Sequence, residues 1–145
     1  MAEKVPQPPT KSSRCWLARG AIAVVWLWNL SAAIPMTLWP ARYAPGFELS
    51  GVVGATLTRS LGLLFLMWLV PYAPALFDPV RYRVCVGVIV AQQMIGLAGE
   101  LWLLWSLPPG HAALRATAWR FIAFDAAGLV LLALAWRWSR DQGSL

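Results

Sequence analysis

Four long apolar segments constrain the fold of this chain more than any other feature of its sequence. They cover residues 17–39, 52–77, 84–107 and 116–138. About 20 helical residues cross the hydrocarbon core of a bilayer, and each segment is long enough to do so. Transmembrane β-strands would alternate apolar and polar residues over about ten positions, and these runs lack that alternation. The pattern therefore predicts an all-α fold, an integral membrane four-helix bundle.

The overall composition agrees with a membrane protein and argues against nucleic-acid binding. Hydrophobic residues make up 59% of the chain and charged residues only 12%, and the mean hydropathy is +0.60. The net charge of +6 comes mostly from cations that lie just outside the apolar runs, where topology signals are found. No basic stripe interleaved with aromatic residues is present, so we expect no nucleic-acid partner.

The ends of the chain are polar and differ from the segments between them. Residues 1–16 contain prolines and cations and are predicted to form a disordered cytoplasmic tail. Residues 17–138 form the membrane domain, and residues 139–145 a cytoplasmic C-terminal tail. A signal peptide is the alternative for the first segment. That segment is longer than an ordinary signal sequence and has no convincing cleavage site, so it is expected to remain as the first helix.

The distribution of cations predicts the orientation in the membrane. With both termini cytoplasmic, eight Lys and Arg lie on the cytoplasmic side and four on or near the other, which agrees with the positive-inside rule. Proline-containing connections over residues 39–51, 70–83 and 106–115 separate the four segments. Several of the ten Trp lie near segment ends, where indoles prefer the interface. We expect a multi-pass protein of the bacterial cytoplasmic (inner) membrane. The eight cations are Lys4, Lys11, Arg14, Arg19, Arg81, Arg83, Arg137 and Arg140, and the four are Arg42, Arg59, Arg115 and Arg120.

Polar residues inside the apolar segments are the candidate functional residues, because charge within a bilayer is costly and usually has a partner or a task. On the third segment Gln93, Gly96 and Glu100 recur at helical spacing and share one face. Asp125 with Gly128 forms an equivalent face on the fourth. Small residues next to polar ones suit helix contacts in lipid. The candidate intramembrane cluster consists of Asn29, Arg59, Gln93, Glu100, Arg120 and Asp125.

Two interpretations of Glu100 remain open. An ion pair with Arg59 or Arg120 would neutralise it and fix the helix register. A ligand site using the same groups is the alternative, since intramembrane ionisable residues are functional candidates by default. Arg120 and Asp125 are five residues apart and do not share a helix face, so their partners are expected on other helices.

No motif for catalysis, metal binding or a cofactor is present. The chain lacks a nucleophile elbow, a phosphate-binding glycine loop and a dinucleotide fingerprint. His111 is the only histidine, and Cys15 and Cys85 are isolated, so no metal site or haem ligand is predicted. Whether the protein is an enzyme stays open. The sequence requires no cofactor and leaves room for a quinone, a lipid or a pigment between the helices.

One stretch resembles a known group of proteins. TRSLGLLFLMWLVPYAPALFDPVRYR, residues 58–83, is similar to the second-helix region of small four-helix membrane proteins of the DoxX-like and BphX-like kind. The shared features are an Arg at the start of the helix, a following Gly, and an Asp-Pro with basic residues at the cytoplasmic end. Some members accompany quinone-linked oxidation systems, so the resemblance implies an accessory membrane role.

These observations lead to two hypotheses of function. The first is a small accessory or assembly subunit of a larger membrane complex of bioenergetic type, with an outward-biased intramembrane polar cluster. Its partners would be the lipid bilayer and other membrane subunits or further copies of itself. The alternative is a small membrane enzyme or a quinone- or lipid-binding protein that uses the cluster as its pocket.

Overall fold

The structure, a computed structural model, describes residues 11–140, and this range consists mostly of helices and contains no strand. Four helices are long and apolar enough to cross a membrane: α1, α3, α5 and α6. The predicted all-α class is thus confirmed, and so is the prediction of four helices that are long and apolar enough to cross a membrane. In chain order the elements are α1 (Lys11–Leu38), α2 (Pro40–Tyr43), the 3₁₀ helix η1 (Ala44–Phe47), α3 (Gly51–Trp68), α4 (Tyr72–Phe77), α5 (Arg83–Ser106) and α6 (Ala112–Arg140).

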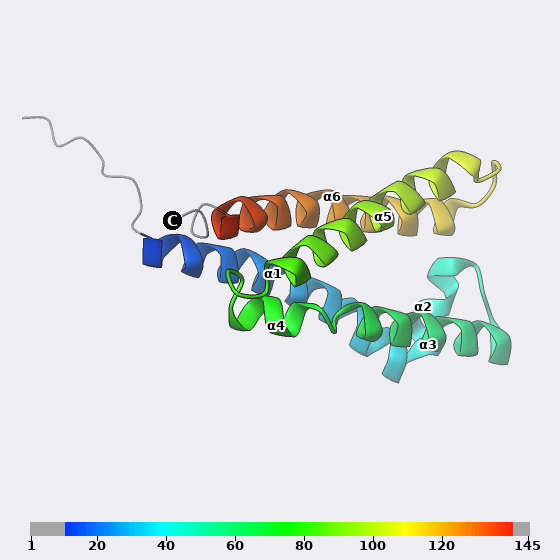
Figure 1. Cartoon of the computed structure of the whole chain (residues 1–145). Helices are drawn as coiled ribbons and strands as arrows, with labels where there is room; N and C mark the ends of the chain where they lie inside the picture. The colour runs from blue at the N-terminus through cyan, green and yellow to red at the C-terminus, as the bar shows by residue number, and fades with distance from the viewer. Residues whose placement is uncertain (1–10, 141–145) are drawn as a thin grey trace, which may run out of the picture.

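The long helices pack in the order α3–α1–α6–α5, so that α3 and α5 are the two ends of an open row. At one end of the molecule the short α4 packs against both α1 and α5. At the opposite end, η1 packs against α3 and α6. We call these the α4 end and the η1 end. Figure 1 shows α3 and α5 diverging from the α4 end toward the η1 end, whereas the start of α1 and the end of α6 lie together.

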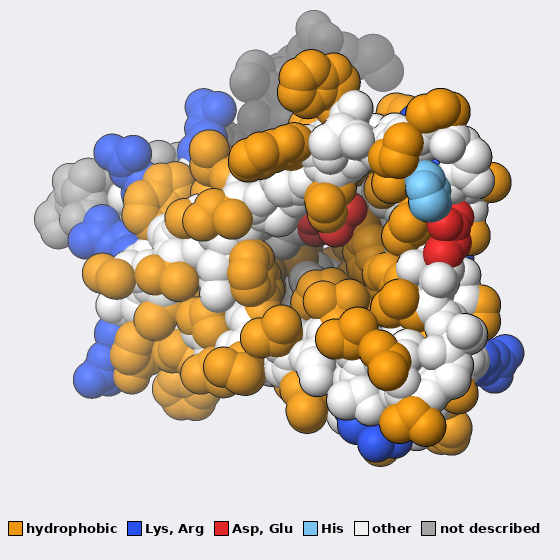
Figure 2. Space-filling model, turned by 90° about the vertical axis from the view of Figure 1, so that its right-hand side faces the viewer, with side chains coloured by type: hydrophobic (Ala, Val, Ile, Leu, Met, Phe, Trp, Pro, Cys, Tyr) orange, Lys and Arg blue, Asp and Glu red, His pale blue; other side chains and the backbone are white. Residues whose placement is uncertain are grey.

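Large apolar side chains cover much of the outer surface, as Figure 2 shows for the face at the η1 end. Val52, Val84 and Trp105 are 83%, 79% and 86% exposed, and many other residues of the long helices are also exposed. In water such a surface would be strongly unfavourable, whereas in a bilayer lipid chains contact it. The helices therefore suit a lipid environment.

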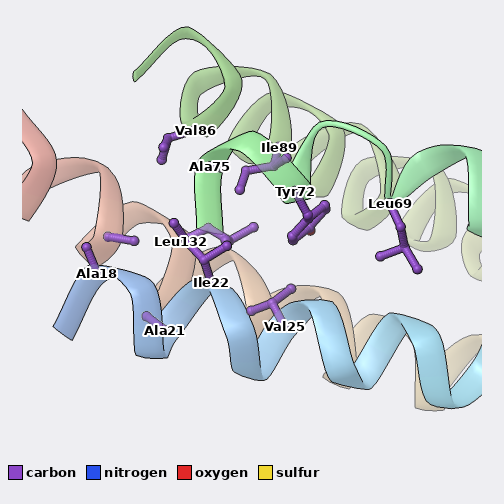
Figure 3. Close-up of a cluster of buried hydrophobic side chains, with 11 residues drawn as sticks. Ala18, Ala21, Ile22, Val25, Leu69, Tyr72, Ala75, Val86, Ile89 and Leu132 are labelled. Carbon is purple, nitrogen blue, oxygen red and sulfur yellow. The ribbon is translucent and has the colours of Figure 1, made fainter. Parts of the chain in front are cut away.

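The closely packed core lies toward the α4 end, where α1, α4, α5 and α6 meet (Figure 3). Ile22, Tyr72, Ile89 and Leu132 are fully buried there. Arg19 on α1 also donates a hydrogen bond of 2.5 Å to the carbonyl of Phe77, the last residue of α4. These contacts hold the α4 end closed. The cluster consists of Ala18, Ala21, Ile22, Val25, Leu69, Tyr72, Ala75, Val86, Ile89, Leu132 and Ala135.

The second apolar segment does not form one helix over residues 52–77, as expected from the sequence. α3 ends at Trp68, and the short α4 follows after a turn. Pro71 precedes α4 and has no N–H to continue the hydrogen bonding of α3. The break turns the chain back toward α1 and α5, so the same residues close the α4 end.

The first helix begins earlier than predicted. α1 starts at Lys11, directly after the prolines of the terminal region, so residues 11–16 of the expected tail are helical. Without a proline at these positions, nothing in the backbone prevents the helix from extending beyond its apolar part. Residues 1–10 and 141–145, the rest of the two predicted tails, lie outside the described residues.

The connection between α1 and α3 folds back on the N-terminal part of α6 and the residue before it through three hydrogen bonds. Thr117 on α6 donates a hydrogen bond of 2.7 Å to the carbonyl of Gly46 in η1. Glu48 Oε2 lies 2.5 Å from His111 Nδ1, and Glu48 Oε1 accepts a weaker bond from the backbone N–H of Leu114 near the start of α6. Glu48 has a positive φ of 56°, a conformation that a non-glycine residue keeps only when its surroundings hold it.

α1 and α3 approach closely at Gly62. A Cβ atom there would lie 2.5 Å from Thr37 Oγ1 and 2.7 Å from the backbone nitrogen of Thr37. Because the second atom belongs to the backbone, it cannot move aside without displacing α1. We expect Gly62→Ala to destabilise the protein by about 1–3 kcal/mol, the usual cost of overpacking. Gly20→Ala is the matched control, since no atom lies within 4 Å of its new Cβ. Thermal unfolding in detergent should show a lower Tm for Gly62→Ala alone, and equal Tm values would show that the helices do not meet at Gly62.

The contact of Glu48 with α6 predicts a pH dependence. The hydrogen bond from His111, together with that from the Leu114 N–H, holds the pKa of the Glu48 carboxyl below its ordinary value of 4.5. The folded state therefore binds this proton less readily than the unfolded chain. The contribution of Glu48 to stability is complete above the ordinary pKa and is lost as the pH falls through the lower, folded value.

Wild type should therefore have a higher Tm than Glu48→Gln at about pH 6, and the two Tm values should converge as the pH falls to about 3. A difference in Tm that stays constant over this range would mean that the ionised carboxylate does not stabilise the fold.

Candidate functional site

A cavity of about 330 Å³ lies between the long helices and η1. It is lined from every described element except α4. Seen from the η1 end, the molecule is hollowed, and acidic side chains lie inside the hollow (Figure 2). The lining residues are Val25, Trp28, Asn29, Ser31, Ala32, Met36, Tyr43, Gly46, Phe47, Phe65, Trp68, Gln93, Gly96, Glu100, Thr117, Arg120, Phe121, Phe124 and Asp125.

The structure brings five of the six predicted cluster residues to this cavity. They are Asn29 on α1, Gln93 and Glu100 on α5, and Arg120 and Asp125 on α6. The predicted shared face of Gln93, Gly96 and Glu100 is confirmed, since all three line the cavity. Helical spacing thus identified the inward faces of α5 and α6.

Arg59, the sixth residue, does not line the cavity. It lies in a separate groove beside the end of α1, and its Nε donates a hydrogen bond of 3.1 Å to the carbonyl of Thr37. The last carbonyls of a helix have no partner within the helix and carry partial negative charge, which favours a cation there. Arg59 therefore caps α1 and does not belong to the cluster.

Gln93 and Asp125 form the floor of the cavity. Gln93 Nε2 donates a hydrogen bond of 2.7 Å to Asp125 Oδ1 and lies 3.4 Å from the Asp125 carbonyl. The hydroxyl of Tyr72 on α4 lies 3.5 Å from Gln93 Oε1, at the limit of a hydrogen bond. Gln93 is only 3% exposed and Tyr72 is fully buried. Asp125 thus has its partner on another helix, as predicted from its position.

The expected ion pair of Glu100 is not formed. Neither Arg59 nor Arg120 pairs with it in residues 11–140, and no hydrogen bond to the Glu100 side chain occurs there. Arg120 instead donates a bond of 3.0 Å to Thr117 Oγ1 on its own helix. The prediction that its partner lies on another helix is therefore wrong. The hydroxyl of Thr117 joins α6 to η1 and holds Arg120 at the cavity wall.

Asn29 also forms its hydrogen bond within its own helix. Its Nδ2 donates a hydrogen bond of 2.9 Å to the carbonyl of Val25, one turn earlier in α1. Such bonds to the preceding turn are common for short polar side chains in helices. The side chain contributes polarity to the α1 wall without joining α1 to another helix.

Aromatic side chains form much of the remaining wall. Phe121 on α6 contacts Phe47 of η1 and Phe65 of α3, with ring centroids 6.3 Å and 5.8 Å apart. Trp28 and Phe124 meet edge to face, with centroids 5.9 Å apart. These rings surround the polar groups with largely apolar surface. The cavity is therefore amphipathic, with carboxylates, an amide and a guanidinium among aromatic rings.

The hydrogen bond between Gln93 and Asp125 at the cavity floor requires glycine at two neighbouring positions. A Cβ at Gly96 would lie 2.8 Å from Asp125 Oδ2, and one at Gly128 would lie 2.8 Å from Gln93 Nε2. Both glycines thus allow α5 and α6 to approach closely enough for the hydrogen bond between Gln93 and Asp125. This is the role predicted for small residues beside polar ones in lipid.

The cavity has an unsealed side. α3 and α5 both contribute to its lining but do not pack against each other, because they are the ends of the open row of helices. No extensive packing of α3 on α5 closes the cavity between Phe65 and Glu100, and Figure 2 shows the hollow from the η1 end. The two carboxylates are only half-buried.

Two residues of the site were missed from the sequence. Tyr72 was assigned to the end of the second spanning helix, and only the break after α3 brings it to Gln93. Thr117 could have been found, because it lies three residues before Arg120 and shares its helix face. No group of three or more potential metal ligands occurs within residues 11–140.

No protein-family model, curated protein or solved structure matches the chain. The resemblance of residues 58–83 to DoxX-like and BphX-like proteins therefore stays a prediction.

The absence of an ion pair at Glu100 can be measured. In a double-mutant cycle of Glu100→Gln and Arg120→Gln, we expect the two changes in unfolding free energy to add within about 0.5 kcal/mol, as for residues that do not interact. Breaking a real buried pair would instead cost about 3–5 kcal/mol for each single change and show strong coupling. Thermal or denaturant unfolding in detergent provides the four values. A large coupling energy would restore the ion-pair interpretation.

Proposed function

We propose that this protein binds a lipid-soluble amphiphile in its cavity. The observation that carries this proposal is that Glu100 and Arg120 line one cavity of about 330 Å³ without pairing with each other. Ionisable groups at membrane depth are normally neutralised by a partner. Here a bound polar group would supply partners for both.

The size and chemistry of the cavity indicate the kind of ligand. Small-molecule sites commonly have volumes of about 300–1,000 Å³, so this one suits a head group or a single ring. Glu100 accepts hydrogen bonds or a positive charge, whereas Arg120 donates to a carbonyl or an anionic oxygen. A quinone or quinol, or a lipid head group with both a donor and an acceptor, fits this arrangement. An apolar tail would leave through the space between α3 and α5.

We propose that the ligand enters the cavity from the bilayer. The open side of the cavity lies between two candidate membrane spans, so a ligand dissolved in lipid could enter without crossing the aqueous phase. The rings of Phe65 and Phe121 would contact its apolar part. We assign the protein a binding role and attach no reaction to it.

The proposed location is the bacterial cytoplasmic membrane, with both termini in the cytoplasm. The excess of cations in the terminal regions and in residues 70–83 supports this orientation. In this topology the α4 end faces the cytoplasm and the η1 end faces outward, so the cavity lies in the outer half of the bilayer.

An accessory role in a larger membrane complex is the second proposal, and it is compatible with the first. The surface of α5 favours this second proposal. α5 is the last helix of the open row, and its Trp102 and Trp105 lie on one side and are 71% and 86% exposed. Large aromatic side chains are common at helix contacts with partner proteins. A partner helix or a second copy could cover this side.

Mass spectrometry of material purified in mild detergent tests the binding proposal. We expect wild-type protein to carry an amphiphilic small molecule in near-stoichiometric amount. Glu100→Gln should retain about tenfold less, because a charge-assisted hydrogen bond is worth about 1.4 kcal/mol or more. Gly96→Ala should also lose ligand, since its Cβ would displace the Asp125 carboxylate. The same preparation identifies any protein subunits that co-purify.

Gly99→Ala is the control on the same helix, because no atom lies within 4 Å of its new Cβ. It should keep the ligand at the wild-type level. Wild-type protein without any bound amphiphile, or equal ligand content in all four proteins, would contradict a binding role for the cavity.

A further inference from the structure

A second depression, separate from the cavity, lies where α1, α2 and α3 meet at the η1 end. It is an open groove of about 540 Å³. Its lining contains two arginines and no acidic residue. The lining residues are Leu38, Trp39, Pro40, Ala41, Arg42, Ala55 and Arg59.

The two arginines are available to a ligand. Arg59 is positioned by the bond from its Nε to the Thr37 carbonyl, and its terminal nitrogens form no hydrogen bond within residues 11–140. The side chain of Arg42 forms no hydrogen bond or ion pair with any described residue. Two guanidinium groups thus border one groove whose lining contains no acidic residue, and this arrangement favours the binding of an anion.

The rest of the groove is apolar and lies at the end of a membrane span. The candidate span of α1 ends at Leu38, and the next residue, Trp39, is 59% exposed. Indole side chains prefer the level of the lipid head groups. Leu38 and Ala55 add apolar surface beside the arginines. The groove therefore combines cations at head-group level with a surface suited to an acyl chain.

We propose that this groove binds the head group of an anionic phospholipid, with the lipid phosphate between Arg42 and Arg59. Guanidinium groups match phosphate oxygens through paired, charge-assisted hydrogen bonds. Basic pockets between membrane helices recognise anionic lipid head groups in this way. The apolar wall favours a lipid over free inorganic phosphate, which would gain nothing from it. The site does not depend on the ligand proposed for the cavity.

Native mass spectrometry of the full chain in detergent, titrated with phosphatidylglycerol, tests the proposal. Arg42→Gln is the decisive variant, because the Arg42 side chain forms no hydrogen bond or ion pair with another described residue, so its loss should leave the fold intact. We expect its affinity for phosphatidylglycerol to fall about tenfold, which is the effect of one charge-assisted contact to phosphate. Arg59→Gln should weaken binding as well, but it also removes the cap of α1.

Arg83→Gln is the matched control, because it removes one exposed arginine at the α4 end. It should bind phosphatidylglycerol as wild type does. Equal affinity of Arg42→Gln and wild type would overturn the proposal, as would equal binding of phosphatidylcholine and phosphatidylglycerol by wild type. Binding of inorganic phosphate that depends on Arg42, without binding of phosphatidylglycerol, would also overturn it and indicate a soluble anion.

Discussion

The hydrogen bond from Gln93 to Asp125 joins α5 to α6 at the depth where the helices would otherwise bury two unsatisfied polar groups. An unpaired amide or carboxylate in an apolar environment costs free energy. The hydrogen bond between these side chains therefore stabilises the contact between α5 and α6. Gly96 and Gly128 make the meeting possible by keeping the space between the helices free of Cβ atoms. Tyr72 then brings α4 to the other side of the Gln93 amide. The closed end of the molecule depends on this local arrangement.

The same arrangement explains why the other end stays open. α4 fills the space between α1 and α5 near the core, but no equivalent element packs between α3 and α5 toward the η1 end of the described chain. The inward faces there carry Glu100 and Arg120, each held on a different wall. Arg120 is anchored through Thr117 to η1, so it does not neutralise Glu100. A bundle built only for stability would gain by replacing both with apolar residues.

Helical periodicity predicted the inward faces well, because a shared face depends only on the 3.6-residue repeat. The shared face of Gln93, Gly96 and Glu100 could be predicted without knowledge of the neighbouring helices. Predicting the partners of the charged residues requires knowing which helices pack together. Arg59 was placed in the cluster because its depth is similar, yet α3 packs on α1, and Arg59 meets the carbonyl of Thr37 instead of Glu100. Tyr72 was missed for a related reason, since a proline break redirects a short segment that looks like the end of a helix.

Reaction with a membrane-soluble carbodiimide tests most directly whether Glu100 is unpaired and reachable from the bilayer. Such reagents modify carboxyl groups in apolar surroundings. In protein embedded in liposomes, peptide mass spectrometry should locate the modification at Glu100, in preference to the exposed Glu48 at the η1 end. Modification should disappear in Glu100→Gln. An unreactive Glu100, under conditions where the reagent labels a reference carboxyl in the same membrane, would contradict the open cavity and favour a sealed, paired carboxylate.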